Sequence, residues 1–272
     1  MKKKATSLLA LLLATVVLLT ACGGGGAGGD GLSGNVLLNG STSVERVIAA
    51  LIEAFNEEHP GVTLTFNPTG SGAGITSATE GTADIGLSSR DLRAEEVDAV
   101  DAITFAIDGL AVLVHPDNPV TNLTLDQLHG IYAGEITNWS EVGGNDQPIA
   151  TVGREAGSGS RGAFDDLVGL DDPVHVQELT SGGAIITAVA QNPYAIGYAS
   201  LSAVNDTVTV LTIDDVAIND VTLRDGSYPV ARPFLMMTQA GVEPSEATRA
   251  FMEFVLSPAA TEIIANAGVV QM

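Results

Sequence analysis

The sequence has 272 residues, and its 11 basic residues against 33 acidic ones give a net charge of −22. A chain this acidic is a poor partner for nucleic acid, and we expect none. No lysine follows Lys4, which excludes a catalytic Schiff-base lysine and a Walker-type phosphate-binding lysine from the rest of the chain.

The N-terminus has the pattern of a processing segment. Lys2–Lys4 precede an apolar run at 8–19, which is short for a membrane-spanning helix and has the flanks of a signal peptide. The run ends in Leu19-Thr20-Ala21-Cys22, which resembles a bacterial lipobox and implies a signal peptide at 1–22 with lipid attached to Cys22. Because Cys22 is the only cysteine, no intramolecular disulfide can form.

Residues 23–34 are rich in glycine, which predicts a flexible tether before a folded part at 35–272. Three short segments then predict strands, the first a buried apolar run and the second an alternating one, and helix patterns lie between them. This alternation favours an α/β fold with a mostly parallel sheet covered by helices. The strands are expected at 36–38, 62–66 and 83–87, and the helices at 44–55, with a stop at His59-Pro60-Gly61, and at about 71–80.

Small polar residues follow each of these predicted strands. Gly40-Ser41-Thr42-Ser43 follows the first, Gly70-Ser71-Gly72 the second and Ser88-Ser89-Arg90 the third. In an α/β sheet these positions lie at the carboxyl ends of the strands, where ligands bind. Turn chemistry alone could place serine and glycine there, but three such loops in succession favour a shared site.

The second half of the chain is predicted to continue as a second lobe. It begins with the apolar stretch 103–114, which Asp108 alone interrupts with a charge. Residues 228–234 are expected to return the chain to the first lobe. Further strands are expected at 149–152, 195–198, 208–211 and 221–223, and helices at 123–131, 185–190, 245–256 and 259–267.

The segment Arg154-Glu155-Ala156-Gly157-Ser158-Gly159-Ser160 is the most informative part of the chain. It joins a guanidinium to a flexible loop and to the start of a predicted helix. The free N–H groups and positive dipole end of that helix, with two hydroxyls and an arginine nearby, suit a small tetrahedral oxyanion. A solvated loop before a helix is the alternative. The acidic surface should repel an anion, although salt screens that field beyond about 10 Å and the local site can still be positive.

Six short motifs are spread over the mature chain, in the order Gly40-Ser41-Thr42-Ser43, Thr69-Gly70-Ser71-Gly72, Asp84-Ile85-Gly86-Leu87-Ser88-Ser89-Arg90, Ala106-Ile107-Asp108-Gly109, Ile136-Thr137-Asn138-Trp139 and Arg154–Ser160. Together they resemble the phosphate-binding lipoproteins of bacterial phosphate ABC importers, which are type II periplasmic binding proteins. The resemblance implies a two-lobed α/β fold with mixed, mostly parallel sheets, helices on both faces and two hinge crossovers, near Ile107 and 228–231. The lobes are expected at 35–106 plus 232–272 and at 107–231.

The resemblance also implies which residues hold the phosphate. Hydroxyls after the first two strands would bind its oxygens, and the Arg154 segment would close over them from the other lobe. Some family members carry an aspartate where this chain has Ser89, so Asp108 is the expected carboxylate here, and the individual roles of Ser88, Ser89 and Arg90 stay open. The predicted ligand residues are Thr42, Ser43, Ser71, Ser89, Arg90, Asp108, Arg154, Ser158, Gly159 and Ser160.

Asp108 is expected to set the ligand specificity. Phosphate keeps at least one proton at neutral pH, whose hydrogen bond a carboxylate can accept, whereas sulfate would meet that carboxylate as a like charge. The alternatives are a turn cap or hinge hydrogen bond for Asp108 and a surface or interlobe ion pair for Arg154. Arg90 would either touch the ligand or orient Asp108, and Arg161 is expected to be solvated or ion-paired.

We therefore expect an extracytoplasmic, lipid-anchored monomer that binds inorganic phosphate between its lobes and delivers it to an ABC permease. The four histidines lack metal-ligand spacing, so neither a metal nor a cofactor is expected, and the protein is expected not to be an enzyme. One alternative is binding of another tetrahedral oxyanion, such as sulfate or molybdate. Others are a signalling or adhesion lipoprotein that kept the fold, and an exported phosphatase, although the sequence shows no metal cluster or positioned base for one.

Overall fold

The computed structural model describes residues 31–272. The predicted signal peptide, Cys22 and most of the predicted tether lie outside these described residues. The chain divides into two units, Met1–Gly31 and Leu32–Met272. Among the helices that the structure describes, none is both long and apolar enough to span a membrane.

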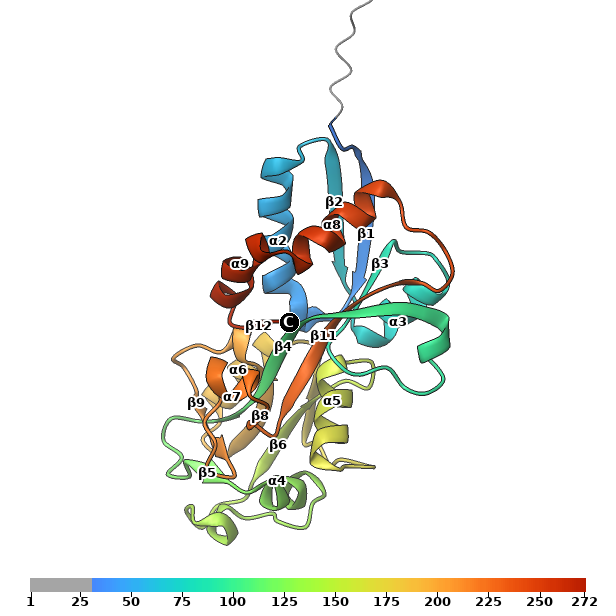
Figure 1. Cartoon of the computed structure of the whole chain (residues 1–272). Helices are drawn as coiled ribbons and strands as arrows, with labels where there is room; N and C mark the ends of the chain where they lie inside the picture. Colours follow the sequence, from blue (N-terminus) through green and yellow to red (C-terminus); the bar gives the residue numbers. More distant parts are fainter. Residues whose placement is uncertain (1–30) are drawn as a thin grey trace, which may run out of the picture. The chain divides into compact units, whose positions relative to one another are not determined.

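A ten-stranded mixed sheet forms the framework of residues 32–272 (Figure 1). Its main strands are β1 (Gly34–Gly40), β2 (Val62–Pro68), β3 (Ile85–Ser88), β4 (Val100–Val114), β6 (Ala150–Arg154), β7 (Gln177–Leu179), β8 (Ala195–Ser200) and β11 (Ala231–Gln239). They lie in the order β2-β1-β3-β11-β4-β8-β6-β7, and β9 (Thr209–Val210) and β12 (Val270–Gln271) also pair with β4. Strands β5 (Asn122–Leu123) and β10 (Thr212–Ile213) form a separate parallel pair.

The two ends of the sheet are parallel and its middle is antiparallel. Strand β1 pairs in parallel with β2 and β3, and β6 pairs in parallel with β7 and β8. Between these groups, β11 is antiparallel to β3 and β4, and β4 is antiparallel to β8. The predicted α/β fold is confirmed. Its parallel groups keep the strand ends after β1, β2, β3 and β6 available for a site.

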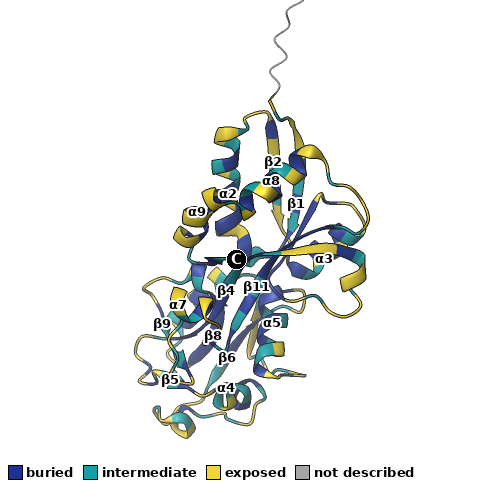
Figure 2. Cartoon of the chain, in the orientation of Figure 1, coloured by how far each residue is buried: buried dark blue, intermediate teal, exposed yellow. Residues whose placement is uncertain are grey.

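Helices cover both faces of the sheet, because the side chains of its central strands alternate between the faces with a period of two. They are α2 (Glu45–Glu58), α3 (Ser71–Thr79), α4 (Leu125–Tyr132), α5 (Gly159–Val168), α6 (Gly182–Gln191), α7 (Asp220–Arg224), α8 (Glu246–Leu256) and α9 (Thr261–Asn266), with short 3-10 turns η1 (Thr42–Val44), η2 (Val97–Ala99), η3 (Trp139–Val142), η4 (Leu201–Ala203) and η5 (Pro258–Ala260). On β11, Phe234 and Met236 pack with α2 and α8, whereas Leu235 and Met237 pack with α3 on the other face. Figure 2 shows the outer faces of α2, α8 and α9 exposed and the central strands buried.

The central strand β4 takes part in two separate hydrophobic cores. Phe105 and Ala106 belong to a core with α2 and α8, whereas Leu110 and Val112 belong to a core with α4 and α5. The change from one core to the other falls beside Ile107, where a hinge crossover was predicted. The division into two lobes at the predicted boundaries stays a prediction.

One predicted strand is wrong. Residues 221–223 form part of helix α7, because the side chain of Asn219 accepts hydrogen bonds from the N–H groups of Val221 and Thr222, and Thr222 Oγ1 accepts one from the Asn219 N–H. This reciprocal cap satisfies the first free donors of the helix. It outweighs the β-propensity of valine and threonine, on which the prediction of a strand rested.

Candidate anion-binding site

The loops after β1 and β6 meet through hydroxyl groups and an arginine. The hydroxyl oxygens of Ser43 and Ser160 lie 2.8 Å apart. Arg154, at the end of β6, donates from Nη2 to Thr42 Oγ1 at 3.2 Å. Residues that lie more than a hundred positions apart in the sequence are thus brought together, as the position of both loops at strand ends predicts.

Ser89, just after β3, joins the loops of the first half of the chain. Its hydroxyl accepts a hydrogen bond from Ser41 Oγ at 2.8 Å and lies 3.4 Å from Ser71 Oγ. The Ser89 N–H also donates to Ser71 Oγ at 3.0 Å. All three loops that follow β1, β2 and β3 therefore contribute a hydroxyl to one buried group.

The first residue of α5 lies against the first residue of α3. A Cβ atom built on Gly159 would overlap Ser71 Oγ and Ser89 Oγ, so only glycine permits this approach. The Ser158 hydroxyl caps α5 by accepting from the Arg161 N–H at 3.4 Å. The positive ends of two helix dipoles are thereby directed to the same region, which favours a negative charge there.

Arg154 is a buried cation without a carboxylate partner in the described part of the chain. Its residue is 1% exposed, and its guanidinium donates to the carbonyl oxygens of Leu179 and Thr180 at 3.0 and 2.7 Å. Among residues 31–272 it forms no ion pair with an acidic side chain. Burial, and then the nearby charge of Arg232, lower the pKa of Arg154.

A second buried arginine, Arg232, is paired with the predicted specificity residue Asp108. The two residues lie opposite each other on the antiparallel strands β11 and β4. Arg232 Nε and Nη2 donate to Asp108 Oδ2 at 2.9 and 2.8 Å, and Ser200 Oγ donates to Asp108 Oδ1 at 2.8 Å. Arg232 Nη1 reaches Ser160 Oγ at 2.8 Å and Ser89 Oγ at 3.3 Å, which connects the pair to both groups of loops.

These contacts define a central polar cluster with an excess of positive charge. Its single carboxylate, Asp108, balances only one of its two guanidinium groups, those of Arg154 and Arg232. Burial raises the pKa of Asp108, an effect that the charge of Arg232 and the Ser200 hydrogen bond oppose. An unbalanced buried charge costs several kcal/mol unless an opposite charge joins it. The cluster consists of Ser41, Thr42, Ser43, Ser71, Ser89, Asp108, Arg154, Ser160, Ser200 and Arg232.

The structure does not bring the Arg90 guanidinium into this cluster. Arg90 donates from Nη1 and Nη2 to the two carboxylate oxygens of Glu96 at 2.8 and 2.7 Å, and from Nη1 to the Asp91 carbonyl at 2.7 Å. The hydrogen bond from Arg90 is also the main reason why the pKa of Glu96 is lowered. Within residues 31–272, no hydrogen bond links Arg90 to Asp108, so neither role predicted for Arg90 is supported by a contact.

Three members of the cluster are absent from the predicted ligand residues, namely Ser41, Ser200 and Arg232, although Ser41 lies in one of the predicted loops. Arg232 carried a recognisable signal, because it stands alone as a charge in the apolar stretch 228–237, as Asp108 does in 103–114. Two lone opposite charges in buried strands are expected to pair. The ion-paired interpretation of Arg161 agrees with the structure, where it contacts Asp165 and Glu178.

Metal binding finds no support in the part of the chain that the structure describes. There, no three histidine, cysteine, aspartate or glutamate side chains are grouped so that they could hold a metal ion. The chemistry available in the central polar cluster is therefore hydrogen-bond donation from guanidinium, hydroxyl and backbone N–H groups. Such donors bind an oxyanion without breaking a bond in it.

Comparisons with known proteins place the chain in a family. A model of the PBP superfamily domain matches residues 25–259. A phosphate-binding protein PstS from Bacillus subtilis is 35% identical over 73% of this chain and 68% of its own length. Among solved structures, a substrate-binding protein from Clostridium perfringens with bound phosphate is 41% identical, with a TM-score of 0.85 over 88% of this chain and 100% of its own. An ABC-type phosphate transport receptor from Vibrio cholerae is 37% identical, with a TM-score of 0.76 over 86% of this chain and 99% of its own. The chain therefore belongs to the PBP superfamily and, within it, to the PstS family of phosphate-binding proteins.

Proposed function

We propose that this protein binds inorganic phosphate in the central polar cluster and delivers it to an ABC importer. The observation that carries the proposal is the buried, unbalanced charge of Arg154, which an oxyanion would neutralise. The names of the similar proteins from B. subtilis and V. cholerae, and the phosphate bound to the one from C. perfringens, support phosphate as that anion.

The donors of the cluster suit a tetrahedral anion with several oxygens. Arg154 offers N–H groups at one side, and the hydroxyls of Ser43, Ser71, Ser89 and Ser160 offer single donors around it. The N-terminal N–H groups of α3 and α5 add dipolar stabilisation. Hydrogen bonds that involve an ionised partner are roughly twice as strong as neutral ones.

Asp108 is proposed to favour phosphate over sulfate. A proton on phosphate can donate to a carboxylate or to one of the serine hydroxyls that Asp108 and Arg232 orient. Sulfate carries no proton at neutral pH, so it would meet the negative charge of Asp108 without a hydrogen bond to offer it. The pairing of Asp108 with Arg232 also limits the excess charge of the cluster to about one unit.

Isothermal titration calorimetry of ligand-free protein with phosphate, sulfate and molybdate tests this proposal. We expect tight, one-to-one binding of phosphate and no measurable binding of sulfate. Binding of sulfate or molybdate in place of phosphate would reassign the ligand. If none of the three anions binds, transport of such an anion is ruled out, and a signalling or adhesion role for the same fold becomes the better proposal.

The protein is further proposed to be a non-enzymatic, extracytoplasmic monomer anchored by lipid at Cys22, with lobes at 35–106 plus 232–272 and at 107–231 that close over the ligand. The lipobox-like sequence before Cys22 supports the anchor. In cells that process lipoproteins, Cys22→Ser should move the protein from the membrane fraction to the soluble fraction. A variant that stays with the membrane would contradict the anchor.

A further inference from the structure

Arg46 occupies an unfavourable position for a cation. It is the second residue of α2, where the positive end of the helix dipole disfavours a positive charge. The residue is exposed, and within residues 31–272 its guanidinium forms no ion pair with an acidic side chain. Neither the helix nor a surface ion pair therefore explains an arginine at this position.

The side chain of Arg46 connects two parts of the protein that have different cores. Arg46 Nη1 donates to the carbonyl oxygen of Ser202 at 2.6 Å. Helix α2 packs in the core that contains Phe105, whereas Ser202 lies in the turn η4 after β8, whose residues pack with Leu110 and Ala111. The bond therefore spans the boundary at which the two predicted lobes would meet.

Beyond Ser202, a chain of polar contacts leads into the central polar cluster. Ser202 Oγ lies 2.7 Å from Ser200 Oγ, which donates to Asp108 at 2.8 Å. Asp108 holds Arg232, and Arg232 donates to Ser160, whose hydroxyl contacts Ser43. Ser43 precedes Arg46 by only three residues. Arg46 thus lies at the exposed end of a chain of polar contacts that runs through the central polar cluster to Ser43.

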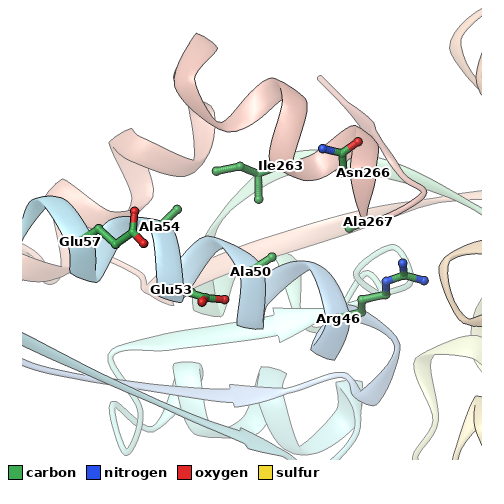
Figure 3. A pocket seen from close by; sticks show the side chains of 8 residues that line it. All are labelled: Arg46, Ala50, Glu53, Ala54, Glu57, Ile263, Asn266 and Ala267. Carbon is green, nitrogen blue, oxygen red and sulfur yellow. The ribbon is translucent and has the colours of Figure 1, made fainter.

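Arg46 also separates two hollows of the surface. A pocket of about 320 Å³ beside the cluster is lined by Thr42, Ser43, Arg46, Ser181 and Ser202, among others. On the other side, a groove of about 430 Å³ runs between α2 and α9, and Figure 3 shows Arg46 at the end of this groove where α2 begins. The first pocket leads to the proposed ligand residues Thr42 and Ser43, so Arg46 lies at its rim.

We propose that Arg46 is a positioning residue that fastens the closed form over bound phosphate. This inference rests on the proposed function. Because the bond from Arg46 to Ser202 joins the two predicted lobes, their separation would break it, so it would stabilise the closed form and not the open one. A contact that favours one state shifts the equilibrium toward that state and slows departure from it. Arg46 should therefore slow the release of phosphate and have little effect on its association.

The test compares phosphate kinetics in full-length wild type, Arg46→Gln, Arg46→Lys and the control Arg249→Gln. Arg249 is an exposed arginine on α8 that pairs with Glu243, so its substitution removes the same charge away from the cluster. Release of radiolabelled phosphate should be about tenfold faster in Arg46→Gln, which corresponds to about 1.4 kcal/mol. Association should change less than twofold, Arg46→Lys should be intermediate, and the control should match wild type.

A thermal unfolding measurement without phosphate separates this role from a structural one. Because Arg46 opposes the helix dipole, Arg46→Gln should leave the unfolding temperature of the ligand-free protein unchanged or higher. A lower unfolding temperature, a release rate equal to that of wild type, or slower association with unchanged release would each overturn the inference. If wild type binds no phosphate, the proposed function itself fails, which is a different result from normal binding without an effect of Arg46.

Discussion

The loop after β3 and the loop after β6 look alike in sequence and differ in the structure. Each follows a buried strand and carries an arginine with neighbouring serines, Ser88-Ser89-Arg90 in one and Arg154–Ser160 in the other. Both arginines are almost fully buried, at 6% and 1% exposure. Arg90 is neutralised by Glu96, whereas the acceptors that Arg154 finds among the described residues are carbonyl and hydroxyl oxygens. What distinguishes the proposed binding arginine, Arg154, from the structural one, Arg90, is thus that no carboxylate within residues 31–272 pairs with it.

The difference between the two loops predicts that removal of Arg154 causes the largest loss of phosphate affinity. Arg154→Gln takes away the unbalanced charge and should weaken phosphate binding by about 100-fold or more, since loss of one partner of a buried charge pair costs about 2–5 kcal/mol. Arg90→Gln removes a charge that Glu96 already balances. It should lower the unfolding temperature and change phosphate affinity less than about threefold. Calorimetric titration of both variants with phosphate shows which of the two arginines contributes to binding. Equal losses of affinity would contradict the proposed difference between them.

The next largest effect is expected where the two loops touch. Gly159→Ala places a Cβ where Ser71 Oγ and Ser89 Oγ lie, so α5 must move away from the loop after β3. We expect phosphate affinity to fall about 30-fold, or about 2 kcal/mol. The matched control is Gly157→Ala, because a Cβ at Gly157 meets no atom within 4 Å. Comparable affinities of the two variants would mean that the close approach is not needed for binding.

A smaller effect, on anion selectivity, is expected from the ion pair of Asp108 and Arg232. Asp108→Asn leaves Arg232 without its carboxylate, which adds about one positive charge to the cluster. The preference for phosphate over sulfate should fall about tenfold, because the like charge that opposes sulfate is gone. The variant should also lose about 3 kcal/mol of unfolding free energy. Competition binding with both anions checks the selectivity, and an unchanged ratio would remove Asp108 from the account of specificity.

The smallest effect concerns Asp165 on α5, the helix that follows the Arg154 loop. Burial raises the pKa of Asp165 to about 6, and Arg161 opposes the rise while Asp166 and Glu178 add to it. The stability that the bound proton contributes is fully present below about pH 4 and is lost as the pH rises through about 6. Asp165→Asn lacks this dependence. Its unfolding free energy relative to wild type should therefore increase by about 2 kcal/mol from about pH 4.5 to 7.

Urea unfolding of wild type and Asp165→Asn at both pH values measures this change. A relative stability of the variant that decreases with pH would show that the carboxylate is stabilised by Arg161 more than it is penalised by burial. Phosphate affinity at neutral pH should be unaffected, since Asp165 contacts no residue of the central polar cluster through a hydrogen bond or ion pair within residues 31–272.

The sequence predicted those parts of the site that depend on local pattern. Strand ends followed by small hydroxyl residues predicted that the loops after β1, β2 and β3 would meet, because parallel strands bring their carboxyl ends together. Ser41, Ser71 and Ser89 are the residues of these loops that lie in contact. The start of α5 near Ser158 followed from its cap and the glycines beside it. Local periodicity also predicted the buried face of α2, in which Val47, Ile48, Leu51 and Phe55 are buried.

The parts that the sequence missed depend on specific side-chain contacts, which residue types and periodicity do not determine. Arg232 and Asp108 are 124 positions apart, and only the register of β4 and β11 makes them neighbours. Glu96 pairs with Arg90 although the two are only six positions apart, because the irregular segment after β3 turns back, and this turn has no helical or strand periodicity to predict it. At 221–223 the residue types favoured a strand, but the side chain of Asn219 determined a helix. Strand register between distant residues and helix capping by side chains cannot be predicted from residue propensities alone.

A crystal structure of the protein grown with phosphate tests the central claim most directly. We expect a tetrahedral anion whose oxygens lie within hydrogen-bonding distance of the Arg154 guanidinium and of the hydroxyls of Ser43 and Ser160, while Arg90 stays paired with Glu96. Phosphate bound at Arg90, or a phosphate complex in which Arg154 contacts only protein carbonyl groups, would contradict the claim that an unbalanced buried charge creates the site.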